Sequence, residues 1–241
     1  MKILFGIPLY AGAIITMFDT FTFLFIHVFG VRKLEAFFAF LVAVMAICFY
    51  INMFIVLPPA ADVFLGFVPY VPPGAGSATI GLVGAVIMPH NLYLHSALVL
   101  SRKIDLSTNV KIRDANMYFA IEAALSLFVS FLINLAVISV FAYWSGEDKI
   151  DGLESAGNAM NTFGAGASAI WAVGLLASGQ SSTMTGTYAG QFVMQGFLDF
   201  KMVAWKRVLV TRSIALVPAL CIAFLEAPET VDNWLNILQS I

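Results

Sequence analysis

Residues 84–96 place polar and sulfur-containing side chains inside an apolar stretch that is long enough to cross a membrane. The stretch contains Met88, Pro89, His90, Asn91 and His95 among apolar neighbours. Polar and titratable groups at bilayer depth are costly, so they mark a functional site by default. A thioether, an amide and two imidazoles could bind a metal ion or relay protons, and this segment is the first candidate for function.

Pro89 predicts a break in this helix. Proline lacks the amide hydrogen that would bond the carbonyl oxygen four residues earlier, here that of Ala85. In lipid an unpaired carbonyl is expensive unless it is buried in protein or lines a cavity, which favours a binding site near mid-membrane. A simple kink whose carbonyl is satisfied by neighbouring helices is the alternative interpretation.

Met88 follows Ala85 by three residues and so lies on the same side of a helix. A carbonyl oxygen is a hard ligand and a thioether sulfur a soft one, so the pair suits iron, manganese or cadmium-like ions over calcium or magnesium. Taken alone, Met88 could also be an ordinary packed methionine.

His90 and His95 are five residues apart, about 140° around a helix, so they cannot clamp one metal from one face. Together with Asn91 they are interpreted as part of a proton path or as a second shell around the metal. The alternative for each histidine is a buried neutral imidazole bonded to a backbone carbonyl.

Asn134 and Arg212 lie in two later apolar segments and are further candidates for the proton path. Arg212 could also simply extend to the membrane surface, as arginines near helix ends do. Asp19 and Glu122 are carboxylates within apolar segments, and the sequence identifies no partner for either.

The composition indicates an all-α integral membrane protein. Hydrophobic residues make up 61% of the chain and charged residues only 11%, against roughly 25% charged in soluble domains. The sequence has no basic patch of the kind that would indicate a nucleic-acid partner. Residues 1–241 are expected to form one transmembrane domain with the start of a seventh span at Leu235 and six full spans, at about 3–29, 34–57, 77–100, 118–144, 167–198 and 208–225.

Basic residues fix the topology of these spans. Nine lie in the first, third and fifth connections, and only Lys149 lies in the connections between. The positive-inside rule therefore predicts that the first span runs from the outside to the cytosol. In the fifth span, a ladder of small residues every four positions predicts a close approach by another helix, with direct substrate contact as the alternative; it comprises Gly174, Ser178, Ser182, Gly186 and Gly190.

Two long motifs resemble those of one transporter family. Residues 85–96 match the sixth-helix motif and residues 179–198 the eighth-helix signature of the natural-resistance-associated macrophage protein (NRAMP) family, proton-coupled transporters of divalent transition metals. Shorter similarities begin at Ile7, Arg32, Ile170 and Leu209, so the resemblance covers nearly the whole chain.

This resemblance implies a partial broken-helix inverted-repeat, or LeuT-like, transporter fold, corresponding to helices four to nine with the tenth just starting. It implies that the Ala85 carbonyl and Met88 hold the metal, with an aspartate and an asparagine of an Asp-Pro-Gly-Asn motif that is absent from this sequence. The expected cargo is Fe²⁺ or Mn²⁺ with protons, and no tightly bound cofactor is expected. The expected partners are the bilayer and the missing helices of a longer parent chain.

The predicted function is proton-coupled import of iron or manganese by the full-length parent. This parent is expected to be a secondary transporter and not an enzyme. The plasma membrane or an endosomal or lysosomal membrane is the predicted location. A truncated, transport-inactive isoform or fragment acting only as an interaction partner is the alternative. An amino-acid transporter of the same broad fold fits less well, because Met88 would have no role in binding a carboxylate.

Overall fold

The computed structural model describes residues 2–8, 11–12, 14–16, 18, 22, 31–102, 107–144, 153–198, 203, 205–206, 208–210 and 213–214. Across these residues the regular structure is helical, without a strand. Its elements are α1 (Lys2–Phe5), α3 (Val31–Val56), α4 (Ala60–Leu65), α5 (Gly76–Val86), α6 (Pro89–Ser101), α7 (Asn109–Tyr143), α8 (Leu153–Met160), the short 3-10 helix η1 (Asn161–Phe163) and α9 (Ala165–Leu198).

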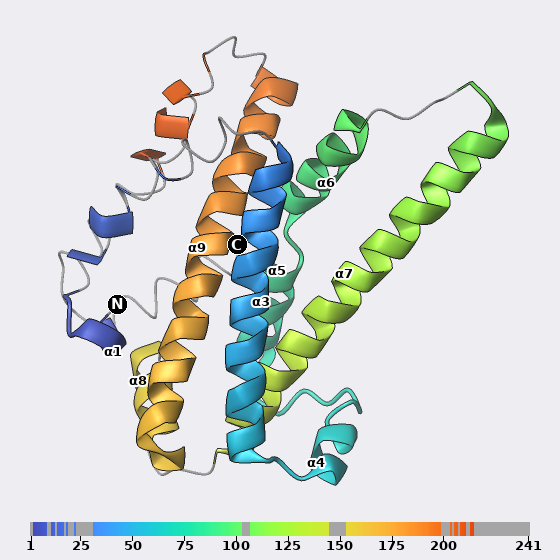
Figure 1. Ribbon diagram of the computed structural model, residues 1–241. Helices are drawn as coiled ribbons and strands as arrows, with labels where there is room; N and C mark the ends of the chain where they lie inside the picture. The colour runs from blue at the N-terminus through green and yellow to red at the C-terminus, as the bar shows by residue number, and fades with distance from the viewer. Residues whose placement is uncertain are drawn as a thin grey trace.

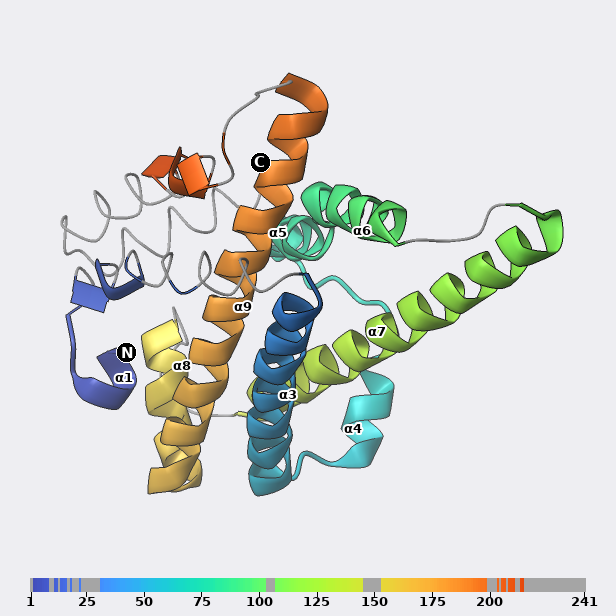
Figure 2. The same cartoon turned by 45° about the horizontal axis from the view of Figure 1, so that its top comes forward.

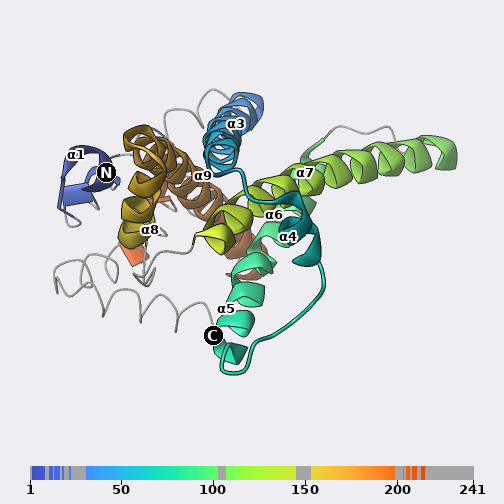
Figure 3. The ribbon, with the colours of Figure 1, turned by 90° about the horizontal axis from the view of Figure 1, so that it is seen from below.

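The long helices alternate in direction, as the charge distribution predicts. In Figure 1, α3 and α7 run downwards, whereas α5, α6 and α9 run upwards. Helices α3 and α9 lie side by side, and α6 and α8 also pack on α9 (Figures 1 and 2). Helix α7 meets α3 near its own C-terminal end and diverges from α9, which is clearest from below (Figure 3).

Two apolar clusters hold these helices together. In the first, Phe49 of α3 and Phe141 of α7 both contact the indole of Trp171 in α9, with ring centroids 5.1 and 4.9 Å apart. The second joins α3, α6 and α9. Its Leu94 lies at the middle of α6 and is buried with Met184 of α9. This second cluster fixes the position of α6 on α9.

The ladder of small residues in α9 allows a close approach by α3 at Gly174. A Cβ atom built on Gly174 would lie 2.8 Å from Cε1 of Phe49 and 3.0 Å from Cβ of Cys48, so α3 approaches α9 closely here. Among the described residues, a Cβ atom on Gly186 would meet nothing within 4 Å. The packing interpretation therefore holds at Gly174, and at Gly186 no described residue approaches in this way.

Within the described residues, three segments are long and apolar enough to cross a membrane: Lys33–Val56, Gly76–Ser101 and Asn109–Tyr143. They overlap the spans expected at 34–57, 77–100 and 118–144. Helix α7 begins well before residue 118, because helical hydrogen bonding continues past the apolar run into its charged first turns. Helix α9 covers the span expected at 167–198 and is not among these three segments. The spans at 3–29 and 208–225 lie largely, and Leu235 wholly, outside the described residues.

Candidate metal site

The helix break lies at Ile87 and Met88. Helix α5 ends at Val86, the next two residues are extended, with ψ of 94° and 98°, and α6 begins at Pro89. The amide of Ile87 still donates to the carbonyl of Val83, at 2.9 Å. Proline suits the first position of α6, because the amide it lacks has no helical partner there in any case.

The end of α5 is a favourable place for a cation. In a continuous helix the carbonyl of Ala85 would accept a hydrogen bond from residue 89, which is a proline and has no amide hydrogen. The last carbonyls of a helix also carry the negative end of its dipole. The C-terminal end of α5 therefore presents oxygen atoms and partial negative charge directly before Met88.

The Met88 side chain is held by Asn91, one turn into α6. The side-chain Nδ2 of Asn91 donates to the Sδ of Met88 at 3.4 Å, and the backbone N–H of Asn91 donates to the Met88 carbonyl at 3.0 Å. Met88 as a whole residue is 38% exposed.

The polar residues of α6 point away from the packed face of this helix. Leu94 is buried against α9, whereas His90, Asn91 and His95 are exposed among the described residues. Segment 76–101 is also the least covered of the membrane-capable segments. Only 6% of its most apolar stretch is buried, compared with 22% of the corresponding stretch in α3 and in α7. Polar backbone and imidazoles cannot face lipid without large cost, so this surface requires protein or water over it.

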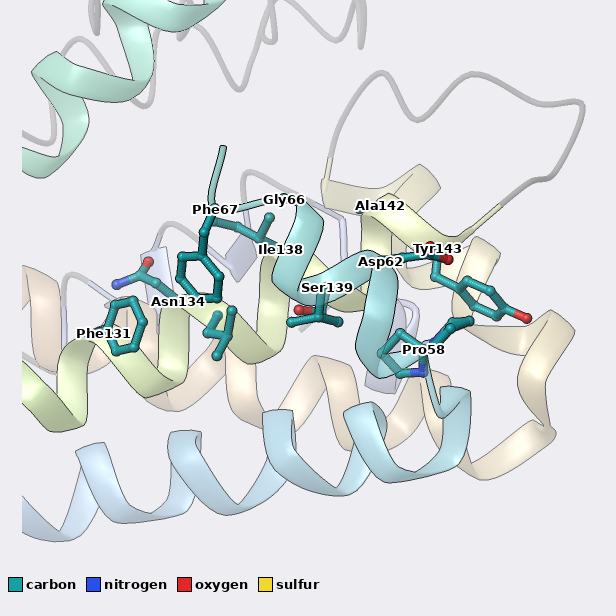
Figure 4. A pocket seen from close by; sticks show the side chains of 13 residues that line it. Pro58, Asp62, Gly66, Phe67, Phe131, Asn134, Ile138, Ser139, Ala142 and Tyr143 are labelled. Carbon is teal, nitrogen blue, oxygen red and sulfur yellow. The ribbon is translucent and has the colours of Figure 1, made fainter. Parts of the chain in front are cut away.

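Asn134 lies elsewhere, in α7. Its Nδ2 donates to the carbonyl of Ser130 at 2.9 Å, and it lines a cavity of about 350 Å³ between α7 and the segment around α4. Figure 4 shows Asn134 and Ser139 on the α7 wall and Asp62 on the α4 wall. Neither α5 nor α6 lines this cavity, so the structure does not bring Asn134 together with Met88.

Two polar residues of α9 border a second, smaller cavity. Gln180 and Thr183 line a space of about 220 Å³ that also touches Ile3 and Thr16. The Oε1 of Gln180 is buried without a hydrogen-bond partner among the described residues. Polar side chains of α9 therefore border this cavity.

Glu122 has a partner that sequence reasoning missed. Arg102, directly after α6, donates from both terminal nitrogens to the two carboxylate oxygens of Glu122 in α7, each at 2.7 Å. Its guanidinium also lies 5.3 Å from the ring centroid of Phe119. The hydrogen bond to Glu122 raises the pKa of Arg102. The pair ties the end of α6 to α7.

The chain matches the model of the family described as natural resistance-associated macrophage protein-like, over residues 1–241. It belongs to the Nramp family. A metal transporter nramp1 homolog of Dictyostelium discoideum is 50% identical over 240 residues, which cover 98% of this chain and 45% of the relative. Human natural resistance-associated macrophage protein 2 is 44% identical over 271 residues, covering 98% of this chain and 47% of the relative.

A crystal structure of the Eremococcus coleocola manganese transporter is also similar, with a TM-score of 0.82 and 31% identity over 99% of this chain and 54% of that one. The LeuT-like Nramp transporter fold expected from the sequence is thereby confirmed. With its membrane-capable helices, this Nramp chain is a membrane protein. It spans about half the length of the curated relatives it matches.

The described part of this Nramp chain does not supply a charged metal site by itself. No group of three or more His, Cys, Asp or Glu residues within that part could hold a metal ion. Arg212 lies outside the described residues, as does Asp19. The two ligands predicted from the sequence, the Ala85 carbonyl and the Met88 sulfur, are both neutral.

Proposed function

We propose that the full-length Nramp protein containing this chain imports divalent transition metal ions, iron or manganese, together with protons. The observation that carries the proposal is the interruption between α5 and α6, where the Ala85 carbonyl loses its helical partner directly before the partly exposed Met88. Relatives with the names of metal and manganese transporters support the choice of cargo.

In this proposal the metal binds at the C-terminal end of α5. The Ala85 carbonyl supplies a hard oxygen, and the negative end of the α5 dipole favours positive charge. Met88 supplies a soft sulfur, which binds iron or manganese and contributes almost nothing to calcium or magnesium. Sulfur thus gives selectivity as well as affinity.

A divalent cation also needs negative charge, because neutral ligands do not replace the hydration that it loses. We assign that charge to parts of the full-length protein beyond these residues. The same parts would cover the exposed polar surface of α5 and α6, which lipid cannot cover.

Proton movement is assigned to the imidazoles beside the metal. An imidazole can both accept and donate a proton, and His90 and His95 both lie on α6 within two turns of Met88. Asn91 and Arg212 remain candidates for the proton path or the second shell, and Asn134, which lies apart from Met88, remains a candidate for the proton path. The plasma membrane or an endosomal or lysosomal membrane is the proposed location, where a more acidic outer or lumenal side would drive import.

Uptake into liposomes tests this function. The full-length protein should take up Mn²⁺ faster when the outside is more acidic, and Ca²⁺ should compete poorly. Met88→Ala should weaken the exclusion of Ca²⁺ more than it weakens Mn²⁺ uptake, because sulfur rejects hard ions. Met117→Ala removes an exposed thioether from α7 and is the matched control. Unchanged Ca²⁺ exclusion in Met88→Ala would remove Met88 as the selective ligand.

The transport-inactive alternative has one observation in its favour, namely the absence of a three-residue His, Cys, Asp or Glu group in the described part of the chain. A natural transcript without an upstream Asp-Pro-Gly-Asn motif, whose product binds partners and shows no saturable Mn²⁺ uptake, would favour this truncated form.

A further inference from the structure

The Asn91 side chain makes an unusual contact directly after the helix break. Met88 is the N-cap residue of α6 and Asn91 is the third residue inside the helix, with Pro89 and His90 between them. In a common capping arrangement the third helical residue reaches back to the backbone amide of the N-cap residue. Here the Asn91 side chain reaches back to the N-cap side chain, 3.4 Å from its sulfur.

The chemistry of the two groups fixes which end of the Asn91 amide faces Met88. A thioether is an acceptor only, so its partner must be the NH₂ group and not the carbonyl oxygen of the asparagine. Met88 makes no side-chain cap hydrogen bond, and its unbranched side chain is intrinsically flexible. The hydrogen bond from Asn91 therefore restricts a sulfur atom that would otherwise sample several rotamers.

We infer that Asn91 is a positioning residue for Met88: it holds the thioether at the helix break so that one sulfur lone pair accepts the amide hydrogen and the other faces the ion. This inference rests on the proposed function, in which Met88 binds the transported metal. Groups that orient a metal ligand typically change metal affinity by 10- to 100-fold when they are removed. Because sulfur is a weak acceptor, we expect a change near the lower end of that range.

A double-mutant cycle in the full-length protein tests the inference. Met88→Leu removes the sulfur and nearly preserves volume. Asn91→Ala should raise the KM for Mn²⁺ uptake by about tenfold when Met88 is present, with kcat little changed. In the Met88→Leu background the same substitution should change KM by less than about twofold, because the group it acts through is gone. Equal effects in both backgrounds would overturn the inference.

Two further variants separate positioning from other roles. Asn91→Asp keeps the shape of the side chain but, when ionised, cannot donate to sulfur, so it should raise KM as the alanine variant does. If Asn91 instead bound the metal through its oxygen, the added negative charge would preserve or tighten Mn²⁺ binding, which would contradict positioning. Ser96→Ala is the control on α6, because the Ser96 hydroxyl bonds the Leu92 carbonyl of its own helix at 3.0 Å.

A measurement without transport distinguishes failure of this inference from failure of the proposed function. In full-length protein labelled at methionine methyl carbons, the Met88 signal is assigned by its loss in Met88→Leu. Asn91→Ala should shift that signal and lower its order parameter, whereas Ser96→Ala should not. An unchanged Met88 signal overturns the inference even if Mn²⁺ uptake is normal. A shifted signal in a protein without Mn²⁺ uptake would support the positioning contact and refute the transport function alone.

Discussion

Replacing Gly174 by alanine tests how closely α3 and α9 pack. The added Cβ atom would lie 2.8 Å from Cε1 of Phe49 and 3.0 Å from Cβ of Cys48. The Phe49 ring could tilt, but it contacts Trp171, and the Cβ of Cys48 cannot move without its helix. The clash must therefore be relieved partly by separating the two helices.

The magnitude follows from two opposing effects. Overpacking a tight contact costs about 1–3 kcal/mol, whereas alanine is intrinsically favoured over glycine in a helix by about 1 kcal/mol. Because one of the two clashing atoms cannot swing away, we expect the upper part of the first range. The net loss in free energy of unfolding for Gly174→Ala should be about 1–2 kcal/mol.

Gly186→Ala is the matched control in the same helix. Its Cβ atom would meet no described residue within 4 Å, so the helical preference for alanine is the effect expected here, and stability should rise by about 0.5–1 kcal/mol. Unfolding of the full-length protein in mixed detergent micelles, followed by tryptophan fluorescence, measures both variants. Equal stability of Gly174→Ala and wild type, or an equal loss in Gly186→Ala, would refute the close approach at Gly174.

Three further predictions concern the break, the ion pair and the isolated segment. Pro89→Ala restores an amide that can bond the Ala85 carbonyl, so Mn²⁺ uptake should fall while expression persists; full uptake together with hydrogen-exchange protection of that amide would show that the break is dispensable. Arg102→Gln and Glu122→Gln should each lower the free energy of unfolding by at most about 1 kcal/mol, since both side chains are about half exposed. The double variant should lose no more than either single variant, and additive losses would argue against direct coupling. Residues 1–241 expressed alone should show no tight Mn²⁺ binding by titration calorimetry, because the two proposed ligands at the break are neutral; saturable binding would mean that a carboxylate of this chain, Asp19 first because Glu122 is paired with Arg102, completes the site.

The break was predictable because its cause is covalent and local. Pro89 removes one hydrogen-bond donor wherever it stands in a helix, and the sequence alone identifies Ala85 as the carbonyl affected. The i to i+3 spacing of Met88 and Asn91 was likewise visible, since such pairs are neighbours on a helix. Apolar run length located the cores of α3, α7 and the segment formed by α5 and α6 for the same reason.

Contacts between helices were not predictable in the same way. A ladder of small residues shows that close approach is possible, but the crossing point depends on the partner, and α3 reaches α9 at Gly174 and not at Gly186. Arg102 and Glu122 are twenty residues apart across a loop, so no helical periodicity relates them. Asn134 was grouped with the proton path by its type, whereas tertiary structure places it in a cavity beside α4.

The length of α7 relates the position of the Arg102 and Glu122 ion pair to the thickness of a bilayer. At about 1.5 Å per residue, its 35 residues extend about 52 Å, whereas the hydrocarbon core of a bilayer is about 30 Å thick. Tyr143 and Trp144 form an aromatic pair at one end, the kind of residue that settles at the lipid boundary. Counting back about 30 Å from Tyr143 reaches Glu122. For a helix along the membrane normal, the ion pair is thus expected at the opposite boundary, and the first turns of α7, which carry Lys111 and Arg113, are expected to extend about 20 Å beyond it, on the side that the positive-inside rule predicts to be cytosolic.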